Sequence, residues 1–300
     1  MVKHYLSRTG ICTSDFTTLP AELSFAKAAR AGFSSVQLSL SSTAESSYTA
    51  DGAIEFPDCA SDECALLADA VSSAAERHGI EVVSVNGTFN MAHPDSEVRL
   101  EGVRRYDALL ALSRDIGCGI VTLCSGTRYR PHLWRYSAEN DTPEAWADML
   151  DTMLRVTEKA EKYGITLAVE TEAANVISTP EKARKLLDTV GSEKLKMILD
   201  PANLFPAGEA KKENVRPILR RAFEVFGYDV VLAHGKDIRE FDGISFCPTG
   251  EGIVDYAYLA ELLDEYGFCG DMMLHGIYDD EKFVSCREFW EKARDSAAKK

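Results

Sequence analysis

Short apolar segments alternate with longer amphipathic segments along the whole chain. The apolar segments are four to eight residues long and rich in β-branched residues, as is typical of strands buried on both faces of a parallel sheet. They cover residues 5–12, 34–40, 81–86, 120–124, 166–170, 196–199, 230–234 and 271–275. The pattern therefore predicts eight parallel strands.

A stretch with helical spacing of its apolar residues follows each predicted strand. These stretches cover residues 21–31, 63–78, 97–115, 142–163, 180–190, 213–226, 256–266 and 283–297. Thr142 and Thr179 each precede a proline and a glutamate, the order expected at a helix start. A glycine follows most of these helices, where a left-handed residue is favoured, and Gly227 is one of them.

The strict alternation of eight strands with eight helices predicts an α/β fold, a single (β/α)₈ TIM barrel over residues 1–300. An open, doubly wound sheet is the alternative. That fold usually carries a glycine-rich phosphate-binding motif after an early strand. No GxGxxG or GxxxxGK[ST] motif follows any early strand here, so the barrel is favoured.

Composition narrows the classes of partner. The chain has 33 Lys and Arg against 48 Asp and Glu, a formal net charge of −15, which argues against a nucleic-acid-binding surface. No apolar run is long enough to cross a membrane, and the first residues lack the pattern of a secretory signal. Eight cysteines are scattered without a CxxC pair. They suit reduced thiols in a cytoplasmic protein.

Polar residues collect at the ends of the last four predicted strands. Barrel enzymes place their chemistry at the carboxyl ends of strands. These ends carry, in chain order, Glu170, Asp200, His234 and His275. Each alone is explained as a hydrogen-bonded strand terminus, but four in succession favour convergence on a shared cation. Two carboxylates and two imidazoles suit Mn²⁺, Co²⁺ or Zn²⁺ better than Ca²⁺. The sequence predicts one divalent metal ion.

Acid is expected to release this metal. Imidazoles bind metals only in the neutral form, so protons compete with the cation for His234 and His275. We therefore expect the metal content to fall below about pH 6. Elemental analysis after dialysis at a series of pH values measures this, and an unchanged content down to about pH 5 would argue against imidazole ligation.

Several segments resemble a known family. They are residues 164–170, 198–204, 233–237 and 250–256, together with 86–95 and 122–128. They look like the xylose-isomerase-like TIM-barrel superfamily, and within it the sugar phosphate isomerase/epimerase branch. The likeness runs from about the second predicted strand to the eighth.

The resemblance implies a divalent metal held by Glu, Asp, His and Glu from four successive strands. The first three map onto Glu170, Asp200 and His234, whereas His275 stands at the position of the fourth. In the ketose 3-epimerases of this superfamily, two metal-bound glutamates exchange the substrate proton from opposite faces, and His275 departs from that pattern. The superfamily also holds zinc-dependent apurinic endonucleases, whose histidine-rich trinuclear site is not matched by the six histidines of this chain.

The predicted activity is that of a metal-dependent isomerase or epimerase acting on a small sugar, polyol or keto acid through a metal-stabilised enediolate. Glu170 and Glu172 are the candidates for proton transfer, and Lys236 for neutralising the enediolate or holding a phosphate. Two alternatives are a dehydratase or lyase at the same site and a sugar-binding barrel without catalysis. The expected partner is a carbohydrate, and the chain is expected to form a homodimer or a homotetramer.

Candidate substrate-binding residues lie in the loops that follow the strands. Asn90 and His93 follow the third strand, and Arg128 and Trp134 lie in the long loop 125–141. Asn203 lies one turn beyond Asp200, where it can contact a sugar hydroxyl or cap the next turn. The Ser- and Thr-rich stretch 41–58 is expected to cover the barrel mouth.

Overall fold

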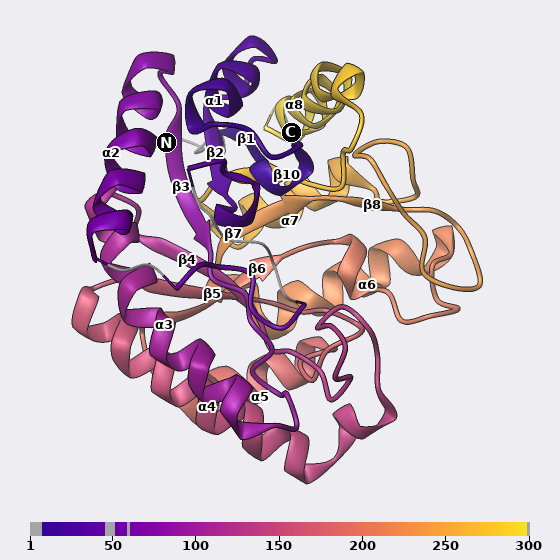
Figure 1. Ribbon diagram of the computed structural model, residues 1–300. Helices are drawn as coiled ribbons and strands as arrows, with labels where there is room; N and C mark the ends of the chain where they lie inside the picture. Colours follow the sequence, from indigo (N-terminus) through magenta and orange to yellow (C-terminus); the bar gives the residue numbers. More distant parts are fainter. Residues whose placement is uncertain (1–7, 46–51, 59–60, 299–300) are drawn as a thin grey trace.

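Eight parallel strands close into a barrel in the order β1-β10-β7-β6-β5-β4-β3-β2 (Figure 1). The computed structural model describes residues 8–45, 52–58 and 61–298. The barrel strands are β1 (Thr9–Cys12), β2 (Ser35–Leu38), β3 (Glu81–Asn86), β4 (Ile120–Cys124), β5 (Thr166–Glu170), β6 (Leu195–Leu199), β7 (Val230–Gly235) and β10 (Met272–Leu274). Strand β1 pairs with β10 on one side and β2 on the other, so the first and last strands close the barrel.

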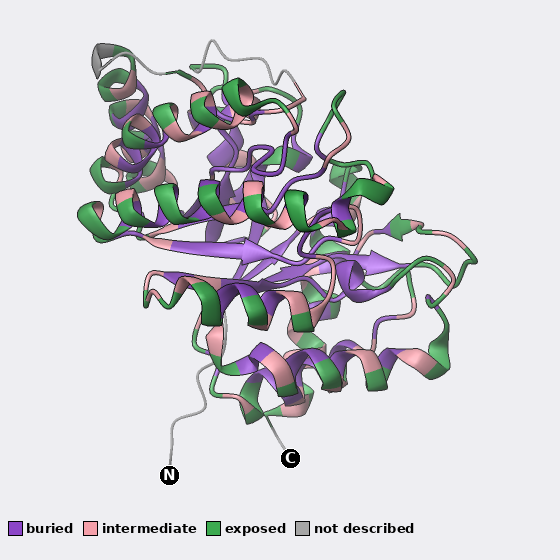
Figure 2. Ribbon diagram, turned by 90° about the horizontal axis from the view of Figure 1, so that it is seen from below, coloured by how far each residue is buried: buried purple, intermediate pink, exposed green. Residues whose placement is uncertain are grey.

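The helices surround the strands and keep one face exposed (Figure 2). They are α1 (Ala21–Arg30), α2 (Ser61–His78), α3 (Ser96–Asp115), α4 (Pro143–Tyr163), α5 (Pro180–Val190), α6 (Lys212–Phe226), α7 (Tyr256–Glu265) and α8 (Phe283–Ala297). Their apolar faces pack on strands that are almost wholly buried. The prediction of a (β/α)₈ barrel is confirmed, and β3, β4 and β5 have the predicted bounds.

A short antiparallel hairpin was not predicted. It consists of β8 (Asp237–Ile238) and β9 (Phe246–Cys247), directly after β7. The buried Asp237 carboxylate holds the segment after β9 in place, because it accepts hydrogen bonds from the backbone N–H groups of Gly252 and Val254. Two-residue strands are too short to show an alternating pattern, so sequence periodicity could not reveal them.

The ends of several helices follow the sequence signals. The Thr142 and Thr179 side chains accept hydrogen bonds from Ala145 N and Lys182 N at the starts of α4 and α5. The expectation of a left-handed residue at Gly227 is wrong, because its φ is −54°. A Cβ there would lie 2.7 Å from Tyr266 Cδ1, so close packing, not backbone conformation, requires this glycine.

Replacing Gly102 by alanine is expected to destabilise the protein. A Cβ at Gly102 would lie 2.1 Å from Phe89 Cδ2, and the Phe89 ring packs in a cluster with the rings of Phe56 and Tyr106. Overpacking of this kind costs about 1–3 kcal/mol, more than the roughly 1 kcal/mol that alanine gains in helix propensity. Denaturant unfolding measures the change, with Gly119→Ala as control because nothing lies within 4 Å of its Cβ. A Gly102→Ala protein as stable as the control would contradict this packing.

The structure also bears on two expectations from composition, about membrane-spanning helices and about disulfides. Within the described ranges, no helix combines the length and apolar character needed to cross a membrane. The seven cysteines whose side chains are described are all free thiols, and Cys59 lies outside the described residues. Five of the seven are buried.

Candidate active site

Three side chains converge where neighbouring strands end. Glu170 ends β5, Asp200 directly follows β6, and His234 lies in β7. Each offers a ligand atom within 4.8 Å of the other two. His234 Nδ1 lies 3.5 Å from Glu170 Oε1 and 3.9 Å from Asp200 Oδ2. All three residues are buried, so the cluster is a compact set of two carboxylates and one imidazole.

The orientation of the His234 ring makes this cluster suitable for a divalent cation. His234 Nε2 lies 3.0 Å from Gln37 Oε1 on β2, a contact that places the proton on Nε2. The lone pair of Nδ1 then faces two carboxylates, and this buried atom has no hydrogen-bond partner among the described residues. A lone pair facing two anions is unfavourable without a positive charge between them. The oxygen and nitrogen donors suit Mn²⁺, Co²⁺ or Zn²⁺.

The two carboxylates of the cluster have different environments. Burial opposes ionisation of Glu170, whereas a protonated His234 and the Lys236 ammonium favour the carboxylate and lower its pKa; with His234 neutral, Lys236 is the cation that does so. Its Oε1 also accepts a hydrogen bond of 2.6 Å from Asn203 Nδ2. Burial raises the pKa of Asp200, whose Oδ1 caps the next turn by accepting from Ala202 N. Glu170 is therefore held ionised, ready to bind a cation or accept a proton.

Lys236 is a buried cation beside these carboxylates. Its Nζ lies 3.1 Å from Asp200 Oδ2 and 4.2 Å from the centre of the Phe246 ring. Burial alone would lower the pKa of Lys236, but Asp200, Glu170 and Glu172 together raise it above its usual value. Burial also raises the pKa of Glu172 to about 7, even though Glu172 accepts a hydrogen bond from Ala174 N.

His275 is held by a carboxylate from the other end of the chain. Its Nδ1 lies 2.9 Å from Asp15 Oδ1, and Asp15 Oδ2 accepts from Ile277 N. Burial lowers the pKa of His275, but Asp15 more than offsets this and raises it. The ring centres of His275 and His234 lie 5.7 Å apart. His275 is not part of the three-residue cluster, so its role as fourth ligand stays a prediction.

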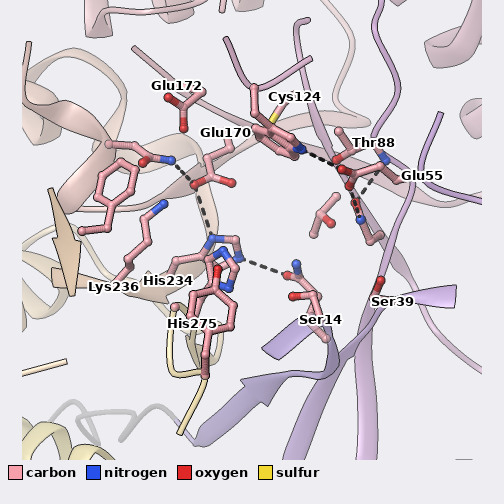
Figure 3. A pocket seen from close by; sticks show the side chains of 18 of the residues that line it. Ser14, Ser39, Glu55, Thr88, Cys124, Glu170, Glu172, His234, Lys236 and His275 are labelled. Carbon is pink, nitrogen blue, oxygen red and sulfur yellow. Dashed lines mark hydrogen bonds and ion pairs between the residues drawn. The ribbon is translucent and has the colours of Figure 1, made fainter. Parts of the chain in front are cut away.

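These groups open into a cavity of about 770 Å³, within the ~300–1,000 Å³ range of small-molecule sites. Figure 3 shows Glu170 and His234 near its centre, with Lys236 on one side and Glu55 and Thr88 on the other. Most of the lining residues carry a polar group, and they include Ser14, Gln37, Ser39, Ser41, Asn86, Thr122, Trp134 and Asn203. Such a lining can bind a molecule with many hydroxyl groups.

Comparison with known proteins identifies the family. Residues 25–297 match the family described as xylose isomerase-like TIM barrel. The chain belongs to this family. The resemblance noted from sequence motifs is therefore confirmed, and the closed eight-stranded barrel agrees with it.

Named relatives and solved structures are similar to this chain over almost its whole length. L-ribulose-5-phosphate 3-epimerase UlaE of Escherichia coli O157:H7 (strain EC4115 / EHEC) is 24% identical over 273 residues, 89% of this chain and 87% of that protein. A D-tagatose 3-epimerase-like protein has a TM-score of 0.71 at 16% identity, covering 97% of this chain and 98% of that one. L-ribulose 3-epimerase has a TM-score of 0.69 at 17% identity, covering 98% of this chain and 96% of that one. The structural matches establish the shared barrel.

The structure sorts the predicted substrate-binding residues of this family member into two groups. Asn203 and Trp134 line the cavity. Asn90, His93 and Arg128 are not among the residues that line it. Each of them is instead bound to other parts of the protein: Asn90 and His93 to the loops that follow β3 and β4, and Arg128 also to Asp148 of α4.

Their contacts explain why these three side chains lie away from the cavity. Asn90 Oδ1 accepts a hydrogen bond from Thr127 N, and His93 Nδ1 lies within hydrogen-bond distance of Asp95 N. Arg128 Nη1 pairs with Asp148 at 2.6 Å and donates to Ala92 O. A long polar loop needs such bonds to satisfy its backbone. Direct contact between substrate and these residues is therefore not supported by their positions.

Several cavity or supporting residues escaped the sequence analysis, and four of them form hydrogen bonds with other side chains of the cavity. Asp15 follows β1 and Gln37 lies within β2, where a polar residue in an apolar strand signals an inward-facing position. Asn86 ends β3, so the strand-end rule that found Glu170 could have found it. Glu55 lies between buried Ile54 and Phe56.

Proposed function

We propose that the protein is a divalent-metal-dependent epimerase or isomerase that moves a proton at the carbon beside the carbonyl of a small ketose. The observation that carries this proposal is the buried Glu170–Asp200–His234 cluster at the strand ends, in which His234 Nδ1 finds no hydrogen-bond partner among the described residues. The relatives that are sugar 3-epimerases support the same chemistry.

The proposed roles follow from charge and position. Glu170, Asp200 and His234 would hold the cation, and His275 is a further donor at the same cavity. When bound, the cation supplies Lewis-acid polarisation of the substrate carbonyl and its neighbouring hydroxyl. Glu170, held ionised, would accept the proton. Glu172 lines the same cavity and is the second candidate for proton transfer, while the Lys236 ammonium would offset negative charge that develops on the substrate.

Proton exchange in D₂O tests this function. The purified protein is stripped of metal, reloaded with Mn²⁺, Co²⁺ or Zn²⁺, and incubated with L-ribulose, D-psicose or D-tagatose and with their terminal phosphates. We expect deuterium beside the carbonyl, together with an epimer or isomer, only in the metal-loaded samples. Nuclear magnetic resonance follows both. Loss of a β substituent would show a lyase or dehydratase instead, and no exchange with any of these compounds would overturn the proposal.

A further inference from the structure

A carboxylate lies at the side of the cavity away from Lys236 (Figure 3). Glu55 Oε2 accepts a hydrogen bond of 2.9 Å from Asn86 Nδ2, and Glu55 Oε1 accepts one of 2.7 Å from Trp134 Nε1. Its backbone is fixed as well, because Glu55 N donates to Thr88 O. The carboxylate is therefore held in one orientation by groups from two other loops or strands.

The Trp134 indole completes this side of the cavity. The neighbouring Leu133 is fully buried, and its backbone N–H donates to Gly52 O while its carbonyl accepts from Asn175 Nδ2. These bonds anchor the loop, and Trp134 remains 47% exposed. An indole with an accessible face can pack against the C–H groups of a sugar, while its N–H stays bound to the carboxylate.

Glu55 retains acceptor capacity. A carboxylate has about four lone-pair positions, and the Asn86 and Trp134 hydrogen bonds use only two of them. Burial raises the pKa of Glu55, as expected for a carboxylate with little water around it. No ion pair links Glu55 to a Lys or Arg in the described part of the chain. Hydroxyl groups can donate to such a carboxylate, whereas a phosphate would be repelled.

The Lys and Arg side chains that line the cavity already have partners. Lys236 pairs with Asp200 at 3.1 Å. Lys282 pairs with Glu251 at 2.6 Å, and Arg239 donates to Phe246 O and lies 3.9 Å from the same Glu251. A phosphate-binding site usually offers donors that are free to converge on the anion. Lys282 and Arg239 are 38% and 51% exposed, whereas Lys236 is buried and held by Asp200. Among the described lining residues, no buried Lys or Arg is therefore free to bind a phosphate.

We infer that Glu55, Asn86 and Trp134 form the subsite for the hydroxyl-bearing tail of the substrate, and that this substrate is an uncharged ketose, not a sugar phosphate. The inference rests on the proposed function and narrows its substrate class. The cation and Glu170 would act at the carbonyl end, and Glu55 would accept hydrogen bonds from hydroxyls further along the chain of the sugar.

Paired ligands that differ only in a phosphate test the inference directly. Calorimetry compares L-ribulose with L-ribulose 5-phosphate, and D-tagatose and D-psicose with their 6-phosphates. It uses the Glu170→Gln protein if elemental analysis shows that this variant retains the added metal, and otherwise the metal-free wild-type protein, since neither would turn the ligand over. We expect a free ketose to bind at least about tenfold more tightly than its phosphate, because like charges oppose each other at Glu55. Equal or tighter binding of the phosphate would overturn the inference.

A charge-removing variant shows whether Glu55 causes the discrimination. Glu55→Gln is expected to weaken binding of the free ketose by about 10–100-fold, the range for a hydrogen bond to a charged group, and to reduce the discrimination against the phosphate. Glu158→Gln, which removes a 69%-exposed carboxylate of α4, is the control and should change neither. An unchanged preference in Glu55→Gln would overturn the assignment of Glu55.

The two proposals can fail separately. Metal-dependent proton exchange with a sugar phosphate, combined with tighter binding of that phosphate, would leave the proposed function standing and refute the uncharged substrate. Absence of both exchange and binding for every compound would refute both proposals. The comparison of the two ligand forms can also be made in the wild-type protein by kcat/KM, so it decides the inference even if Glu55→Gln does not fold.

Discussion

Replacing Glu170 by glutamine is expected to lower turnover of the ketose by about 10²–10⁴-fold, the usual cost of losing a general base. Glu170 is held ionised beside His234 and Lys236 and is fixed by Asn203. Glutamine keeps the shape of the side chain and one oxygen atom that can bind a metal, but it cannot accept a proton at neutral pH. The rate of deuterium exchange into the substrate measures the effect, with metal content determined on the same samples.

The metal determination separates the two roles of Glu170. Loss of exchange with the metal retained indicates a proton-transfer role, whereas loss of both indicates a ligand role. Glu158→Gln again serves as the control for removal of a surface carboxylate. Full activity in Glu170→Gln would show that the proton is moved by another group and that the assignment to the end of β5 is wrong.

Replacing Lys236 by methionine is expected to lower the free energy of unfolding of the metal-free protein by about 3–5 kcal/mol, the cost of removing one partner from a buried ion pair. The variant leaves Asp200, Glu170 and Glu172 without their buried ammonium. Denaturant unfolding measures the change. Added Mn²⁺ or Zn²⁺ should recover part of it, because a cation that binds only the folded state stabilises that state.

A second lysine of the same cavity provides the control for this substitution. Lys282 also lines the cavity and pairs with Glu251, but its side chain is 38% exposed. Exposed ion pairs contribute about 0–1 kcal/mol, so Lys282→Met should change stability little. An equally small loss of unfolding free energy in the two variants would mean that the Lys236 ammonium does not stabilise the buried carboxylates.

The barrel was predictable from sequence because its strands are buried on both faces. Most of the barrel strands therefore appear as mainly apolar runs, and the cluster residues Glu170, Asp200 and His234 were visible as the polar residues that end such runs. The β8–β9 hairpin was not visible, because its strands hold two residues each. The polar ends of strands thus carried most of the information about the site.

Residues in loops were harder to assign. Arg128 and Trp134 lie in the same loop, yet Arg128 pairs with Asp148 on α4 while Trp134 reaches Glu55. Nothing in the spacing of the loop residues distinguishes the two, because their directions depend on the tertiary contacts of the neighbouring Leu133 and Asn140. Glu55 was missed for the same reason, since its partners come from distant segments.

The contacts that hold the two histidines join opposite ends of the chain. Gln37 lies 197 residues before His234, and Asp15 lies 260 residues before His275. At ~5–20 residues per second, a ribosome needs on the order of tens of seconds to synthesise the chain between such partners. Until β10 has been made and pairs with β1, the barrel is open and Asp15 has no imidazole to hold. Biosynthesis therefore orders the events: the closure of the barrel and the pairing of Asp15 with His275 both wait for the last strand, whereas Glu170, Asp200 and His234 have all been made before it.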